Sequence, residues 1–171
     1  METRGLWEFH LNRRWNGISL APRLGKSEDI TVMPISSVVN KTLGQIRTTV
    51  TGRVTVKEIL DHLSVAQSEG LLSFSELIDA SEPGLPYLSV DEIWNAAGAV
   101  RATKFTEPPG PRAVVVSSPT TFGLVRIFTT LLSGHFPIDV FRSEAAALDW
   151  LSSHSRVQSP VPPPSAGGPP S

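Results

Sequence analysis

The sequence contains no cysteine. Disulfides, cysteine-based zinc sites, iron–sulfur clusters and thiol nucleophiles are therefore excluded within these residues. A surplus of positive charge is also missing, because 15 Lys and Arg residues stand against 16 Asp and Glu residues. Nucleic acids and anionic membranes attract proteins through basic surfaces, so we expect no nucleic-acid partner.

Long hydrophobic runs are lacking as well. No stretch approaches the roughly 18 consecutive apolar residues of a membrane-spanning helix. The first residues also lack the basic segment, apolar stretch and cleavage site of a secretory signal, so we expect no transmembrane segment and a cytoplasmic location. Hydrophobic residues are nevertheless plentiful. They make up 40% of the chain, against 18% charged residues, and this proportion is sufficient for a hydrophobic core.

The two ends of the chain differ in composition from its middle. Pro, Gly and Ser dominate residues 153–171, and such a segment buries too little apolar surface to become ordered, so we predict a disordered tail. Residues 1–29 are predicted to be a flexible arm. Trp7, Leu11 and Trp15 are four apart, which would place them on one helical face suited to a peripheral membrane or partner contact. We favour a simple extension over such a contact.

Residues 30–152 are predicted to form the folded domain. Ile30, Val32 and their neighbours indicate a first strand, and residues 46–51 alternate between apolar and polar side chains with the period of two typical of a strand. Turn-forming residues lie between them. The two segments therefore predict an antiparallel hairpin.

Helices and further strands follow in alternation. Capping-box patterns at Thr55–Glu58 and Ser89–Glu92 mark two helix starts, Ser118 followed by proline marks a third, and Ser143 marks the last. Strands are predicted at 74–80, 113–116 and 138–141. This order predicts an α/β domain with a mostly parallel sheet of about five strands, an antiparallel edge hairpin and about four helices.

Four stretches of the domain carry a family pattern. They are IRTTVTGRVTVKEIL (46–60), FSELID (74–79), RAVVVSSPTTFGLVR (112–126) and VFRSEAAALDWL (140–151). Together they resemble the bacterial SpoIIAA-like proteins of the STAS group. The resemblance implies a STAS-like fold and a non-enzymatic role, either protein–protein switching or the binding of a small or lipid-like ligand between sheet and helices.

One family feature is missing. Anti-sigma-factor antagonists of this group carry Asp-x-Ser-Gly at a helix N-terminus, with the serine as phosphoacceptor. Here Asp79 and Ser81 are followed by Glu82 instead of glycine, and the next helix opens at Ser89. Ser81 and Ser89 are therefore the candidate phosphoacceptors, although capping the helix already explains Ser89.

Candidate polar site residues lie where two strands end. Asp79 ends a predicted inner strand, where open α/β sheets bind ligands, although bonding to the following turn also explains it. Ser117, Ser118, Thr120 and Thr121 lie where a strand leads into a helix and could hold an anion, although capping also explains them. The histidines, including His62 on the polar side of its helix, show no zinc spacing. We expect no metal, no cofactor and no catalytic residue.

The third helix is apolar nearly all round. One of its faces carries Phe122, Val125, Phe128 and Leu132, and the other carries Leu124, Ile127 and Leu131. A helix of this kind is usually buried or covered. Core packing, a second subunit or an apolar ligand would each cover it.

Three functions remain open at this point. The first is an interaction or regulatory module that binds a protein partner, or a second copy of itself, through the third helix. The second is a binder of a small apolar or lipid-like molecule, which an apolar pocket of about 300 Å³ or more would favour. The third and least supported is an enzyme that uses Asp79 with the Ser117–Thr121 cluster.

Overall fold

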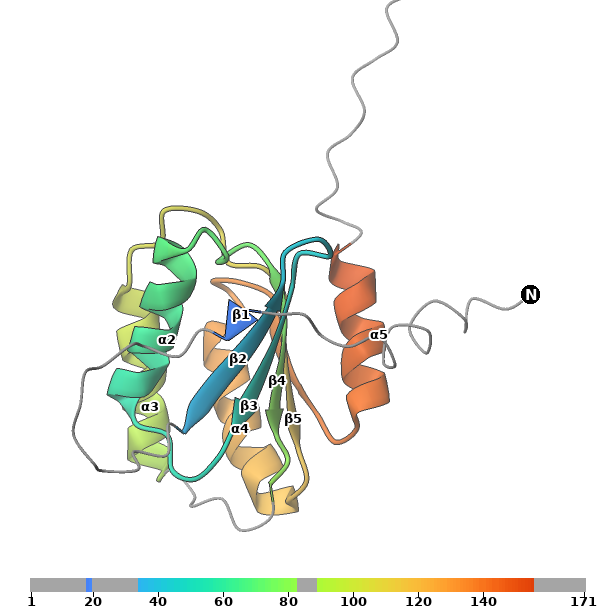
Figure 1. Ribbon diagram of the computed structural model, residues 1–171. Coiled ribbons are helices and arrows are strands. Elements are labelled where there is room, and N and C mark those ends of the chain that lie inside the picture. Colours follow the sequence, from blue (N-terminus) through green and yellow to red (C-terminus); the bar gives the residue numbers. More distant parts are fainter. Residues whose placement is uncertain (1–17, 20–33, 83–88, 156–171) are drawn as a thin grey trace, which may run out of the picture.

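The computed structural model describes residues 18–19, 34–82 and 89–155. Within these ranges six strands form one sheet and four helices pack against it (Figure 1). The strands are β1 (Ile18–Ser19), β2 (Ile35–Asn40), β3 (Gln45–Val50), β4 (Ser75–Ala80), β5 (Arg112–Val116) and β6 (Ile138–Phe141). The helices are α2 (Val56–Ser68), α3 (Val90–Ala102), α4 (Pro119–Leu132) and α5 (Glu144–Ser155).

The strands lie in the sheet in the order in which they occur in the chain. β1, β2 and β3 pair in antiparallel fashion, and β3, β4, β5 and β6 pair in parallel. A helix connects each pair of consecutive parallel strands, because such strands need a long crossover. The predicted α/β class, with its parallel sheet and antiparallel edge hairpin, is confirmed.

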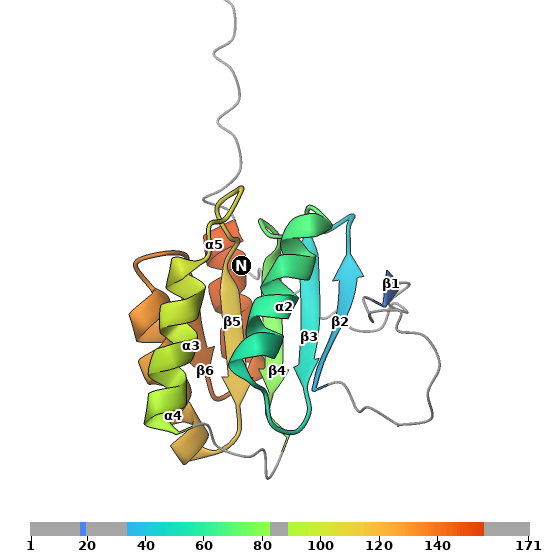
Figure 2. The same ribbon diagram turned by 90° about the vertical axis from the view of Figure 1, so that its left-hand side faces the viewer.

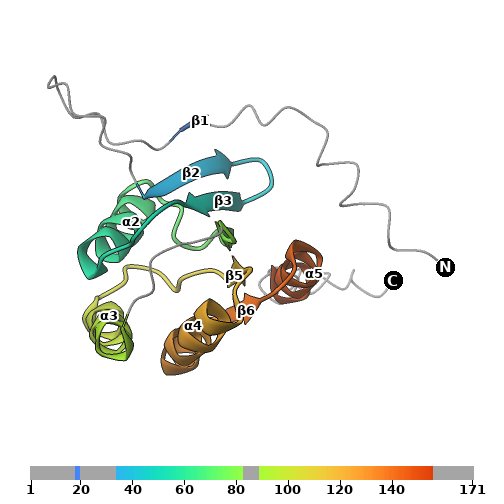
Figure 3. The same ribbon diagram turned by 90° about the horizontal axis from the view of Figure 1, so that it is seen from below.

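The helices cover the two faces of the sheet unequally. Of the helices in the described ranges, only α5 packs on one face, against β4, β5 and β6, while α2, α3 and α4 lie on the opposite face, which Figure 2 views from the helix side. α4 lies against β6 and β5, whereas the close backbone contacts of α3 are with α2 and α4 (Figure 3). α3 is therefore an outer cover over the space between its two neighbours and the sheet.

Local sequence signals set the helix boundaries. Thr55 and Ser89 each form a capping box with the glutamate three residues later, as predicted. The Ser118 hydroxyl accepts a hydrogen bond from the Thr121 N–H at the start of α4, and the Ser143 hydroxyl accepts one from the Ala146 N–H in α5.

Some expected boundaries differ from the structure. The first strand of the hairpin is Ile35–Asn40, while Ile30 and Val32 lie outside the described residues. β1 pairs with β2 although it belongs to the segment assigned to the N-terminal arm, and α5 continues to Ser155, beyond the predicted boundary at 152. The rest of both predicted arms, including the Trp7, Leu11 and Trp15 face, lies outside the described residues.

β5 is an inner strand of the sheet, between β4 and β6, and it is buried on both faces. All of its five residues are buried, as the continuous apolar run 113–116 predicts for a strand covered on both faces. Ala113 and Val115 face α5, where they pack with Ala147 and Leu151. The alternate residues of β5 face α4 and the space below α3.

Candidate functional site

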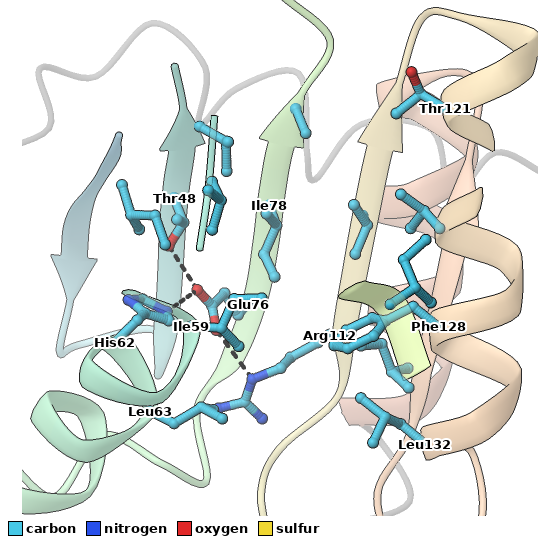
Figure 4. Close-up of a pocket in the computed structure, with 18 of the residues that line it drawn as sticks. Thr48, Ile59, His62, Leu63, Glu76, Ile78, Arg112, Thr121, Phe128 and Leu132 are labelled. Carbon is cyan, nitrogen blue, oxygen red and sulfur yellow. Dashed lines mark hydrogen bonds and ion pairs between the residues drawn. The ribbon is translucent and has the colours of Figure 1, made fainter. Parts of the chain in front are cut away.

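A cavity of about 210 Å³ lies between the sheet and helices α2, α3 and α4. Ile59 comes from α2, Ile78 from β4, and Phe128 and Leu132 from α4 (Figure 4). Ile93 of α3 also lines the cavity. The surface that faces the cavity is almost entirely apolar. The cavity therefore offers a hydrocarbon environment between the sheet and three helices.

The two ends of the cavity differ in exposure. Glu76 and Arg112, at the amino ends of β4 and β5, are buried. At the other end, Gly52 is exposed, and Val50 and Thr121 are only half-buried. Among the described residues, the less buried part of the lining thus lies toward the carboxyl ends of the parallel strands, which is where open α/β sheets bind ligands.

A buried ion pair closes the inner end. Glu76 and Arg112 are direct neighbours in the parallel register of β4 and β5. The Arg112 Nε atom lies 3.0 Å from Glu76 Oε2, in an ion pair that lacks the alignment of a hydrogen bond. Arg112 also donates to the carbonyl oxygens of Gly110, at 2.9 Å, and Leu72, at 3.3 Å.

The second carboxylate oxygen of Glu76 has two partners. Glu76 Oε1 accepts a hydrogen bond of 2.6 Å from the Thr48 hydroxyl and lies 2.7 Å from His62 Nε2. Because the single hydroxyl proton of Thr48 points to Glu76, the Ser37 hydroxyl, 2.8 Å away, must donate to Thr48. A chain of polar groups thus runs from β2 through β3 to the carboxylate on β4.

The charges of this cluster shift one another's pKa values. Burial alone would raise the pKa of Glu76, but the charges of His62 and Arg112, with hydrogen bonds from His62 and Thr48, lower it to about 2. The negative charge of Glu76 raises the pKa of His62, against the opposing effects of burial and of Arg112. Glu76 is therefore ionised at neutral pH, and its carboxylate is the shared partner of His62 and Arg112.

Asp79 lies on the opposite face of the sheet from the cavity. Its carboxylate lies 3.6 Å from Arg47 and accepts hydrogen bonds from the Ser81 hydroxyl, at 2.6 Å, and from the Ser81 N–H, at 3.1 Å. Arg47 in turn donates two hydrogen bonds, of 2.6 and 3.0 Å, to Glu144 of α5. Asp79 therefore acts here in turn bonding and in anchoring α5.

The serine and threonine candidates are dispersed. Thr121 lines the cavity, Ser118 caps α4, and Thr120 and Ser117 are exposed. The structure does not bring Thr121 together with Asp79, because the two residues lie on opposite faces of the sheet. Ser89 caps α3 and Ser81 bonds to Asp79, and phosphorylation of either serine stays a prediction.

The predicted apolar face of the third helix, now α4, turns inward. Val125, Phe128 and Leu132 line the cavity, and Phe122 packs against a cluster that contains Val116. Large exposed apolar side chains of the described residues lie elsewhere, at Leu43, Val65, Val90 and Trp94. α4 therefore supplies a cavity wall.

The three charged residues of the inner cluster, Glu76, His62 and Arg112, were not predicted as site residues from the sequence. Glu76 and Arg112 are each two residues from a core-facing apolar side chain of the same strand, so both lie on the inward face. The sequence could have predicted this ion pair, because Glu76 and Arg112 are opposite charges at inward-facing positions of two neighbouring strands. The placement of His62 on a polar helix face was wrong: it follows Ile59 by one helical turn, and its side chain is 19% exposed.

Comparisons with known proteins identify no relative. No family model, curated protein or solved structure matches this chain. Across the described ranges, no helix has both the length and the apolar content needed to span a bilayer. The same ranges contain no group of three or more His, Asp and Glu residues arranged to hold a metal ion. The site must therefore be interpreted from its own geometry.

Proposed function

We propose that this protein binds a small apolar molecule in the cavity between the sheet and helices α2, α3 and α4. The observation that supports this proposal is the apolar cavity of about 210 Å³, whose less buried described lining lies toward the carboxyl ends of the strands. Apolar cavities of about 150 Å³ stay dry and bind benzene. The volume does not reach the ~300 Å³ that was expected from the sequence for a ligand site, so the proposed ligand is smaller than a drug-sized molecule and has the size of a substituted ring or a short chain.

The fold supports such a site because α3 does not pack directly on the sheet, and the space between this helix and the strands forms the cavity. α3 contacts its neighbouring helices more closely than the strands, so the apolar side chains of the sheet below it face the cavity. Burial of a ligand there gains about 0.8 kcal/mol for each CH₂ group. Six such groups would gain about 5 kcal/mol, equivalent to a Kd of about 0.3 mM before the cost of association is subtracted, so we expect weak binding in the millimolar range.

The resemblance to SpoIIAA-like proteins points the same way. One of the roles that it implies is ligand binding between sheet and helices, which is where this cavity lies. The alternative of an enzyme that combines Asp79 with the Ser117–Thr121 cluster receives no comparable support, since Asp79 lies on the other face of the sheet.

Filling the mouth of the cavity should abolish binding. Thr121 is half-buried and lines the cavity, whereas Thr120, the neighbouring residue of the same helix, is exposed. We expect Thr121→Trp to weaken binding of toluene and 1-hexanol at least tenfold, and Thr120→Trp to leave it unchanged. Chemical-shift titrations by NMR measure both affinities.

The titrations have two outcomes that would contradict the proposal. One is that neither probe binds the wild-type protein at concentrations near its solubility. The other is that both tryptophan variants bind the probes as the wild type does, which would place the binding outside this cavity. Circular dichroism of each variant shows whether the fold is intact.

A second candidate function is the interaction module expected from the sequence. Val90 and Trp94 are one turn apart on α3, and their exposed fractions are 48% and 54%. We expect that, in this case, two copies associate through this surface and not through α4. Sedimentation equilibrium would then show a dimer that Trp94→Ser dissociates and that Val65→Ser, an exposed substitution on α2, leaves intact. A wild-type protein that is monomeric at every concentration removes this candidate.

A further inference from the structure

We infer that the ligand is a short hydrocarbon chain or ring that is polar at one end at most, and that its apolar end fills the inner end of the cavity. Glu76 and Arg112 close that inner end, and the apolar group would lie beside Ile78 and Phe128. This inference rests on the proposed function, because it names the chemical class and the orientation of the ligand in the same cavity.

The first argument is that the carboxylate of Glu76 is already occupied. Its Oε1 atom accepts a hydrogen bond of 2.6 Å from Thr48 and lies 2.7 Å from His62 Nε2. Its Oε2 atom faces Arg112 Nε at 3.0 Å, and both of these atoms are fully buried. Glu76 as a whole is 0% exposed. A donor on the ligand would therefore find no accessible acceptor on this side chain.

The second argument is that the guanidinium of Arg112 is also engaged within the protein. It donates to the carbonyl oxygens of Gly110 and Leu72, and it lies 5.4 Å from the centre of the Phe136 ring. Figure 4 shows it pointing toward Glu76 and away from Phe128. An acceptor on the ligand would therefore find no accessible donor here.

The remaining polar groups of the inner cluster point into the cluster as well. The Thr48 hydroxyl donates to Glu76 and accepts from Ser37. His62 contacts Glu76 through Nε2, and its other ring nitrogen lies on the far side of the ring from that contact, away from Phe128 in Figure 4. This is why the surface that the described residues present to the cavity is almost entirely apolar despite the charges behind it.

These contacts decide which end of a ligand lies where. A hydroxyl or charged group at the inner end would lose its hydration without gaining a partner, which should weaken binding about tenfold or more. At the other end, Gly52 is exposed and Val50 and Thr121 are half-buried, so a polar group placed there loses less of its hydration. A molecule with polar groups at both ends does not fit this arrangement.

The experiment compares two isomers, 1,2-hexanediol and 1,6-hexanediol, with 1-hexanol as the reference. The first isomer carries both hydroxyls at one end, whereas the second must place one of them at the inner end. Chemical-shift titrations by NMR measure each Kd, and each is corrected for the partition of the compound between water and octanol. We expect 1,2-hexanediol to bind about tenfold more tightly than 1,6-hexanediol after this correction.

Two nearly isosteric variants test the cause of this preference. Val114 lines the cavity two residues after Arg112, and its neighbour Val115 faces α5 on the other side of the sheet. Val114→Thr brings an unpaired hydroxyl to the apolar wall, so it should give 1,6-hexanediol a partner and narrow the difference between the isomers at least threefold. Val115→Thr makes the same change outside the cavity and should leave the difference as it is. Circular dichroism checks the fold of both variants.

The outcomes separate this inference from the proposed function. If 1-hexanol binds and the two diols bind equally after correction, the inferred orientation is wrong while the apolar site stands. The same holds if 1-hexanol binds and neither diol does, because polar groups are then rejected at both ends. If none of the three compounds binds, both proposals are wrong. The wild-type comparison decides the question even if a variant is unstable.

Discussion

The variant Glu76→Gln should lower the free energy of unfolding by about 3–5 kcal/mol. The substitution keeps the shape of the side chain but removes the negative charge that faces Arg112 and His62. Arg112 is 3% exposed and then has no counter-ion, and an unpaired buried charge is far more costly than the pair is favourable. Urea unfolding at neutral pH, followed by circular dichroism, measures the change.

Two further variants test the cause of this loss. Asp61→Asn makes the same chemical change in the exposed ion pair with Lys57, so we expect a far smaller effect. The double variant Glu76→Leu with Arg112→Met removes both charges and should recover part of the lost stability. Recovery is partial because the carbonyls of Gly110 and Leu72 lose their donor. A Glu76→Gln protein as stable as the wild type would show that the cluster is not ionised.

Acid unfolding provides an independent measure of the same cluster. The pKa of Glu76 is lowered from 4.5 to about 2 in the folded protein, so its contribution to stability is fully present above pH 4.5. It is lost as the pH falls from 4.5 toward 2, and amounts to about 3 kcal/mol. The Glu76→Gln variant should lack this part of the pH dependence.

The substitution Gly110→Ala should destabilise the protein by about 3 kcal/mol or more. A Cβ atom at this position would lie 2.3 Å from the carbonyl oxygens of both Ser73 and Phe74. These are backbone atoms, so they cannot rotate away. The Gly110 N–H also donates to Leu72, which fixes the two segments against each other. Thermal and urea unfolding of the variant measure the loss.

Gly98 provides the matched control, with an effect of opposite sign. It lies within α3, and a Cβ atom there would meet nothing within 4 Å. Gly98→Ala should therefore stabilise the protein by about 0.5–1 kcal/mol, because alanine loses less conformational freedom in a helix. Equal effects of the two substitutions would contradict the close approach of the segments at 73–74 and 110.

Much of the fold could be predicted from local patterns. The capping boxes at Thr55 and Ser89 set the starts of α2 and α3, because a cap is formed by residues only three apart. The alternation in β3 and the continuous apolar run in β5 likewise distinguish a hairpin strand from a strand that is covered on both faces. β1 could not be predicted, since a two-residue strand has no period and depends on β2 for its bonds.

The site was harder to predict because it is assembled from distant segments. The two strand ends singled out at Asp79 and Ser117–Thr121 do lie near the carboxyl edge of the sheet, but Asp79 points to the face covered by α5. A shift of one residue along a strand reverses the face on which a side chain lies. Glu76, at odd spacing from Asp79, therefore faces the cavity instead.

Local sequence patterns are sufficient to set the succession of strands and helices, because periodicity, caps and turn residues act over a few neighbouring positions. Packing between distant segments is what places α3 above the sheet as a cover and brings Glu76, His62 and Arg112 together. The register of β4 against β5 and the packing of α2 bring these three together. Such contacts join residues 14 to 50 positions apart, and their energy exists only once the elements have packed.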